Sequence, residues 1–151
     1  MKVHTAAGCG PFFEQRMGLR VLGHDPALPG SDSLERLLDE ADVLLFAVPI
    51  RRTVEVVDAC VARSEGREHG RLWLDITSIK QAPVAAMLCS QAEVVGLHPM
   101  VAPPKAPTLK GRVLVICEAR RGVWRGRIAQ SIDALQPECV RVSPEPYARG
   151  M

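Results

Sequence analysis

Aromatic side chains are scarce in this chain and make up only 4% of its 151 residues. Because proteins that bind single-stranded nucleic acid stack the bases on aromatic rings, this scarcity argues against nucleic acid as a partner. The formal net charge of +2 leaves no strong excess of positive charge to attract phosphates. The densest basic stretch, residues 120–127, is interpreted as the exposed polar face at the start of a surface helix.

Long apolar runs and paired cysteines are also missing. No run is long enough to span a membrane, and the N-terminal residues show no signal-peptide pattern. The five cysteines are odd in number, lie far apart and include no CxxC pair, so neither a disulfide framework nor a metal site is predicted. Because reduced thiols are typical of the cytoplasm, we expect a soluble, cytoplasmic protein with no membrane partner.

Apolar runs that are typical of strands alternate with segments of helical periodicity along the chain. This alternation predicts βαβ units, and therefore an α/β fold with a doubly wound, mostly parallel, Rossmann-like sheet in one domain, residues 1–151. A helix beginning after Ser31 or Asp32 would be capped by one of them. Strands are expected at residues 2–7, 20–24, 43–48, 72–76, 94–97, 113–117 and 139–142, and helices at 12–17, 34–41, 53–61, 77–90 and 123–135.

The first predicted strand is followed by a glycine turn with the pattern GxGxxF. Gly8 and Gly10 match the first two glycines of a dinucleotide fingerprint, but Phe13 replaces the third. Asp25 follows the second strand, where an acidic residue binds the ribose hydroxyls and favours NAD over NADP. Asp25 comes sooner than the usual distance of about 20 residues, so the first βα unit is shortened. A plain glycine turn explains the pattern equally well.

A histidine ends the apolar run of residues 94–97. Pro99 biases His98 towards extended backbone, which places the imidazole at the carboxyl end of a strand, where open α/β sheets bind ligands. An imidazole there is suited to act as a general base near neutral pH. Alternatively, His98 has no catalytic role, and its imidazole only makes hydrogen bonds within a loop. Ser78 similarly matches a helix cap, because Gln81 completes a capping box.

Several stretches together resemble the prephenate dehydrogenase family of tyrosine biosynthesis, and most closely its bacterial branch fused to chorismate mutase. They read Val-Pro-Ile at residues 48–50, Leu-Asp-Ile-Thr-Ser-Ile-Lys at 74–80, Gly-Leu-His-Pro-Met at 96–100 and Leu-Lys-Gly-Arg-Val-Leu-Val-Ile-Cys at 109–117. The similarity keeps order and spacing from about residue 42 to residue 151.

The resemblance implies an oxidoreductase that uses NAD(P) to oxidise and decarboxylate prephenate or arogenate, a small cyclic carboxylic acid. His98 matches the histidine that accepts or hydrogen-bonds the proton of the 4-hydroxyl group. Ser78 matches the serine that supports this histidine and the nicotinamide. With NAD as the expected cofactor, the residues predicted to contact it are Gly8, Gly10, Asp25, Val48, Pro49 and Ile50.

The chain also departs from the family pattern. Residues 101–103 read Val-Ala-Pro where the family has Phe-Gly-Pro, and the family's helical dimerisation domain would begin where this sequence stops. We therefore expect a homodimer or a partner protein to cover the surface that such a domain would occupy. Two other hypotheses stay open here. One is a catalytically silent Rossmann-type interaction module, and the other is an imine or pyrroline reductase of the same fold.

Overall fold

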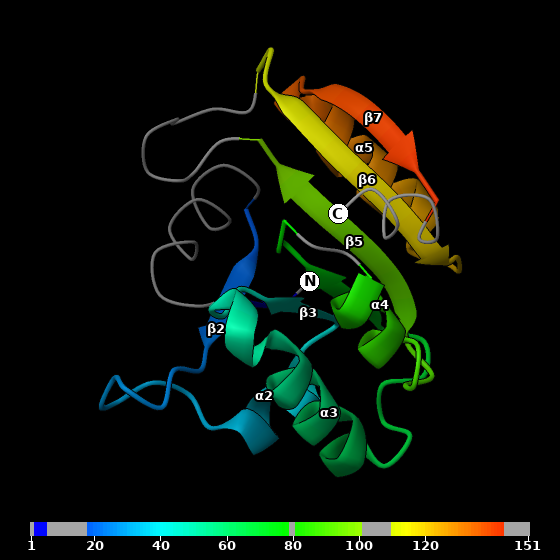
Figure 1. Cartoon of the computed structure of the whole chain (residues 1–151). Helices are drawn as coiled ribbons and strands as arrows, with labels where there is room; N and C mark the ends of the chain where they lie inside the picture. The colour runs from blue at the N-terminus through cyan, green and yellow to red at the C-terminus, as the bar shows by residue number, and fades with distance from the viewer. Residues whose placement is uncertain (1, 6–17, 79–80, 101–109, 144–151) are drawn as a thin grey trace.

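Seven strands form a single sheet in the order β2-β1-β3-β4-β5-β6-β7 (Figure 1). The structure is a computed structural model that describes residues 2–5, 18–78, 81–100 and 110–143. Strands β1 to β5 are mutually parallel, β6 is antiparallel to β5, and β7 is parallel to β6. The strands are β1 (Lys2–Thr5), β2 (Arg20–Gly23), β3 (Val43–Phe46), β4 (Leu72–Asp75), β5 (Glu93–Pro99), β6 (Val113–Arg120) and β7 (Glu138–Val142).

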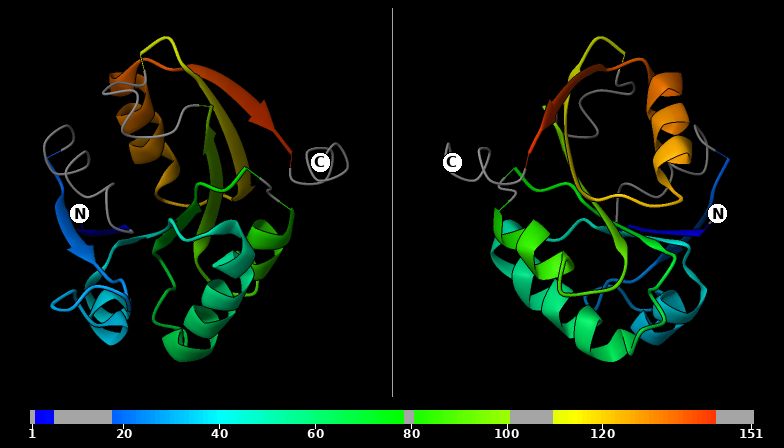
Figure 2. Two further views of the ribbon diagram at one scale, coloured as in Figure 1. Left: turned by 60° about the vertical axis from the view of Figure 1, so that its left-hand side comes forward. Right: turned by 90° about the vertical axis from the view of Figure 1, so that its right-hand side faces the viewer.

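Helices cover both faces of this sheet. Leu37 of α2, Val57 of α3 and Met87 of α4 belong to one buried cluster, whereas Ile132 of α5 belongs to another. Figure 2 shows α3 and α4 side by side and α5 away from them. The predicted doubly wound α/β fold is therefore confirmed. The helical elements are α2 (Leu34–Glu40), the 3-10 helix η1 (Ile50–Arg52), α3 (Thr53–Ser64), α4 (Gln81–Met87) and α5 (Arg125–Leu135).

The central strands are apolar on both faces, as expected for parallel strands that are covered on both sides. All four residues of β3 and all four of β4 are buried. Phe46 and Trp73 lie in the cluster that faces α3 and α4, where their rings meet edge to face with centroids 5.4 Å apart. Leu45 and Leu72 lie in the cluster on the other face. Alternate residues of each strand therefore lie on opposite faces of the sheet.

The cap of α2 differs from the prediction. Ser33, not Ser31 or Asp32, is the N-cap, and its hydroxyl accepts a hydrogen bond from the backbone N–H of Arg36. The Asp32 carboxylate turns back towards the end of β2, where it accepts a bond of 2.9 Å from the N–H of Gly23. Its second oxygen pairs with Arg36 at 2.7 Å. Asp32 therefore ties the strand end to the helix start.

Several element boundaries also differ. β3 ends at Phe46, two residues short of the prediction, and Thr77 and Ser78 precede α4 instead of beginning it. Ser90 lies in the turn after α4, where its hydroxyl donates to the carbonyl of Met87 and accepts from the N–H of Ala92. The predicted helix at residues 12–17 lies outside the described residues.

Arg120 corrects the interpretation of the basic stretch. It belongs to β6 and is half-buried, and its guanidinium donates to the backbone oxygens of Leu88, Ser90 and Ala92. The guanidinium therefore satisfies carbonyl groups of the turn that links α4 to β5. Arg125 and Arg127 are exposed on α5, as predicted for a surface helix.

Candidate functional site

The strand order reverses at β1. The chain passes from β1 to β2 on one side and then to β3 on the other side of β1 (Figure 1). In open α/β sheets, ligands bind outside the carboxyl ends of the strands at such a reversal. Because β1 to β5 are parallel, their carboxyl ends share one edge of the sheet. We call the ends of these five strands, with the described residues that follow them, the carboxyl edge.

Asp25 lies at the carboxyl edge in the loop after β2 and is half-buried. Its Oδ1 accepts a hydrogen bond of 2.9 Å from the N–H of Ala27, and its backbone carbonyl accepts from the hydroxyl of Ser31. The loop is thus held by its own hydrogen bonds, with the Asp25 carboxylate in a local turn. In the β1–β2 pairing Gly23 is opposite Thr5, so Asp25 follows a strand that ends level with β1.

Val48, Pro49 and Ile50 follow β3, on the other side of the reversal. The carbonyl of Pro49 accepts bonds from the N–H of Arg52 at 2.8 Å and from the hydroxyl of Thr53 at 3.3 Å. These bonds turn the chain sharply into η1 and α3. Val48 is half-buried and the side chain of Ile50 is 45% exposed, so this turn presents an apolar surface at the carboxyl edge.

Ser78 lies in the loop after β4, and His98 is the second-last residue of the neighbouring strand β5. In the β4–β5 pairing Asp75 is opposite Gly96, and Ser78 and His98 come three and two residues later. Both residues therefore lie at the carboxyl edge, from adjacent strands. Ser78 is exposed and His98 is half-buried. His98 is also paired with Val115 of β6, which keeps its backbone extended to the end of the strand.

Asp75, the last residue of β4, also lies at the carboxyl edge, and it is not among the site residues predicted from the sequence. Its side chain is fully buried, and Oδ2 accepts bonds from both the N–H and the hydroxyl of Thr77. A signal was present in the sequence, since a carboxylate ends the apolar run of β4. Sequence alone does not distinguish a buried carboxylate in this position from a solvated one.

The structure thus brings Ser78 and His98 onto adjacent strand ends, and it places Asp25 and residues 48–50 after the strands that flank β1. Gly8 and Gly10 lie outside the described residues. Their predicted contacts with the cofactor remain a prediction.

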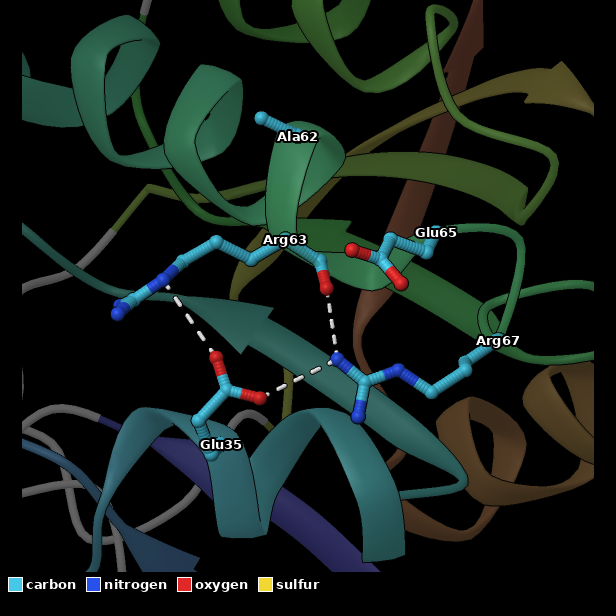
Figure 3. A pocket seen from close by; sticks show the side chains of 5 residues that line it. All are labelled: Glu35, Ala62, Arg63, Glu65 and Arg67. Carbon is cyan, nitrogen blue, oxygen red and sulfur yellow. Dashed lines mark hydrogen bonds and ion pairs between the residues drawn. The ribbon is translucent and has the colours of Figure 1, made fainter.

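A pocket of about 530 Å³ lies away from the carboxyl edge and is lined by Glu35, Ala62, Arg63, Glu65 and Arg67 (Figure 3). Glu35 pairs with Arg63 at 3.5 Å and with Arg67 at 3.3 Å. The hydrogen bond to Glu35 raises the pKa of Arg67. Because residues 63–67 end α3 and lead towards the start of β4, the pocket lies at the opposite edge of the sheet. Three of its charged side chains, those of Glu35, Arg63 and Arg67, already pair with one another.

Within the described ranges, no three residues of the types His, Cys, Asp and Glu are grouped to hold a metal ion. The cysteines described there are free thiols: Cys60, Cys89, Cys117 and Cys139. Among the helices described, none has both the length and the apolar character needed to cross a membrane.

Most of this chain is similar in sequence to known proteins. Residues 29–136 match the family model "Prephenate dehydrogenase, nucleotide-binding domain". The T-protein of Enterobacter agglomerans is 33% identical over 88 residues, which are 58% of this chain and 22% of that protein. The chain thus spans less than a quarter of that relative's length.

Solved structures share the fold at low sequence identity. Synechocystis arogenate dehydrogenase superposes with a TM-score of 0.76 at 13% identity, over 97% of this chain and 61% of that chain. Aquifex aeolicus prephenate dehydrogenase, in complex with hydroxyphenyl propionate and NAD+, gives 0.74 at 16% identity over 97% and 61%. The family match covers well over half of the sequence, and the shared fold agrees with it. The chain therefore belongs to the family of prephenate dehydrogenase nucleotide-binding domains.

Proposed function

We propose that this chain is the catalytic nucleotide-binding part of an NAD-dependent dehydrogenase that oxidises and decarboxylates prephenate or arogenate. The observation that carries the proposal is the placement of Ser78 and His98 on adjacent strand ends at the carboxyl edge, in a chain of this family. A silent interaction module would not require a serine and a histidine together at the ligand-binding edge.

NAD fits the residues at the reversal of the sheet. The carboxylate of Asp25 suits the ribose hydroxyls of the adenosine half, and its negative charge disfavours the 2′-phosphate of NADP. Val48 and Ile50 supply an apolar wall after β3. A related enzyme from Aquifex aeolicus holds NAD+, which supports the same cofactor here. Gly8 and Gly10 are proposed to contact the pyrophosphate.

NAD, when bound, accepts the hydride from the ring carbon that bears the 4-hydroxyl group. We propose that neutral His98 accepts the proton of that hydroxyl as the hydride leaves, while loss of carbon dioxide makes the ring aromatic. Ser78 holds the imidazole and the nicotinamide in place by hydrogen bonding. The substrate is a small cyclic carboxylic acid.

A turnover assay tests this proposal directly. With prephenate or arogenate and NAD, the chain should form reduced NAD, followed by absorbance, and release an equal amount of carbon dioxide. His98→Asn should lower kcat by roughly 10²- to 10⁴-fold, the usual contribution of a general base. His69→Asn is the matched control, because His69 is an exposed histidine in the turn before β4. An absence of turnover in the wild-type chain at saturating NAD and both substrates would contradict the catalytic role.

A homodimer or a partner protein is proposed to cover the carboxyl edge. Ile50 and Met100 follow β3 and β5 there, and their side chains are 45% and 56% exposed. Free thiols at the described cysteines suit the cytoplasmic location that we propose. Sedimentation of the chain at rising concentration tests self-association, and a strictly monomeric mass throughout would exclude the homodimer.

A further inference from the structure

The carboxylate of Asp75 lies in an unusual position for an acid. β4 is the middle strand of the seven, and the side chain of Asp75 at its end is 0% exposed. The three preceding residues of the strand are Leu72, Trp73 and Leu74. A leucine or valine would be buried here without desolvating a charge, whereas a buried carboxylate must be compensated by hydrogen bonds. A carboxylate at this position therefore indicates a role besides packing.

The residue beside Asp75 differs between its two neighbouring strands. Asp75 is opposite Phe46 on β3 and opposite Gly96 on β5. Of these two residues, Gly96 has no side chain. Side chains two residues apart on a strand share a face, so Asp75 shares the face of Trp73 and His98 shares the face of Gly96. The paired positions put Asp75 and His98 on the same side of the sheet.

A single oxygen of Asp75 makes two hydrogen bonds to one residue. Oδ2 accepts from the backbone N–H of Thr77 at 3.2 Å and from its hydroxyl at 2.5 Å. Thr77 is itself only 7% exposed. The two bonds close a local turn at the end of the strand, and this turn restricts the direction in which the backbone leaves it. Ser78, the next residue, is exposed.

We propose that Asp75 and Thr77 form a clasp that positions Ser78 beside His98 at the carboxyl edge. Both residues of the clasp are positioning residues, because they act through Ser78. The Asp75 side chain lies on the same face of the sheet as the His98 side chain, and its bonds to Thr77 hold the backbone that leads to Ser78. The role of Ser78 in catalysis rests on the proposed function, but the placement of Ser78 by the clasp does not.

The first experiment measures this placement without any cofactor or substrate. The amide resonance of Ser78 is compared by NMR in the wild-type chain, Asp75→Ala and Thr77→Val. Thr77→Val keeps the shape of the side chain and removes the hydroxyl, so it is the variant expected to fold best. The Ser78 resonance should shift in both variants, and Thr77→Ser, which restores the hydroxyl, should return it towards the wild-type position.

A matched control separates positioning from loss of stability. The hydroxyl of Ser64 is buried at the end of α3 and donates to the carbonyl of Cys60 at 2.6 Å. Ser64→Ala removes one buried hydrogen bond of a hydroxyl group at the end of α3, away from the carboxyl edge where Ser78 lies. It should lower the thermal midpoint as Thr77→Val does, while the Ser78 resonance stays unchanged. A Ser78 resonance that is unmoved in folded Asp75→Ala and Thr77→Val would overturn the clasp.

The second experiment measures catalysis. Thr77→Val should lower kcat by about tenfold to a hundredfold, the effect of misplacing a group by roughly 1 Å, with KM changed much less. The double variant should be no slower than Asp75→Ala alone, since both substitutions remove the same bonds. Additive losses, or wild-type kcat in Thr77→Val, would contradict the clasp. If the wild-type chain shows no turnover, the proposed function fails, and the NMR comparison still decides the clasp.

Discussion

Two carboxylates near the end of β2 have different uses, although they lie only seven residues apart. Asp32 bonds the N–H of Gly23 through one oxygen and Arg36 through the other, so both of its oxygens serve the fold. Asp25 has a single described side-chain bond, from the N–H of Ala27 to Oδ1. Asp25 therefore has more capacity to accept bonds from a ligand. The hydrogen-bond partners, more than the residue type, distinguish the structural acid from the candidate binding acid.

The buried thiol of Cys60 predicts how stability depends on pH. Burial raises the pKa of Cys60 from 9.0 to about 11, although the positive charge of Arg63 opposes the shift. The folded chain therefore holds this proton more tightly than the unfolded chain. The resulting contribution to stability is present below pH 9 and is lost as the pH rises from 9 to 11.

Thermal midpoints measured across this range test the prediction. The midpoint of the wild-type chain should fall more steeply between pH 9 and pH 11 than that of Cys60→Ala, which has no thiol to ionise. Cys139→Ala is the control, because Cys139 is exposed on β7. Equal slopes in the wild-type chain and Cys60→Ala would contradict the assignment.

At the scale of elements, the start of α5 depends on a buried carboxylate from another strand. Glu93 of β5 is 6% exposed, and its Oε2 accepts a 2.8 Å bond from the N–H of Trp124, the N-cap residue of α5. The indole N–H of Trp124 in turn donates to the carbonyl of Gly70 at 2.9 Å. These bonds fix α5 against the sheet at the edge opposite the candidate site.

Gly122 is predicted to be essential to this arrangement. A Cβ at this position would lie 2.8 Å from Oε2 of Glu93, so Gly122→Ala must displace the carboxylate from Trp124. We expect a loss of about 1–3 kcal/mol in the free energy of unfolding, the cost of leaving a buried polar group without its partner. Chemical denaturation measures it.

Gly126→Ala on the same helix is the matched control. A Cβ there meets nothing within 4 Å, so the variant should be stabilised by up to about 1 kcal/mol through helix propensity. A Gly122→Ala chain as stable as the wild type would show that Glu93 moves without loss.

The elements themselves could be predicted well where apolar runs are continuous. Residues 43–46 and 72–75 form strands as expected, because a run buried on both faces has few alternatives. The predicted cap of α2 was wrong because Ser31, Asp32 and Ser33 are all good cap residues. The hydrogen bond that the Asp32 carboxylate accepts from the N–H of Gly23 selects among them and leaves Ser33 as the cap. Asp75 was missed for a similar reason, since burial depends on neighbours that are distant in sequence.

At the scale of the whole molecule, the sheet combines a parallel part and a reversed pair. β6 is antiparallel to β5, and β7 is parallel to β6 after the crossover through α5. An apolar run such as residues 113–117 predicts a strand but carries no information on its direction. The parallel part, β1 to β5, collects the candidate binding and catalytic residues at one edge, whereas the reversed pair extends the sheet beyond them.

A calorimetric titration tests whether the carboxyl edge binds NAD. NAD should bind the wild-type chain at one site and more tightly than NADP. Asp25→Ala should weaken NAD binding by about tenfold to a hundredfold, the loss expected for hydrogen bonds to a charged group. Asp58→Ala is the control, because Asp58 is an exposed acid on α3. Absence of binding by either nucleotide at millimolar concentration would exclude NAD as the cofactor of this edge.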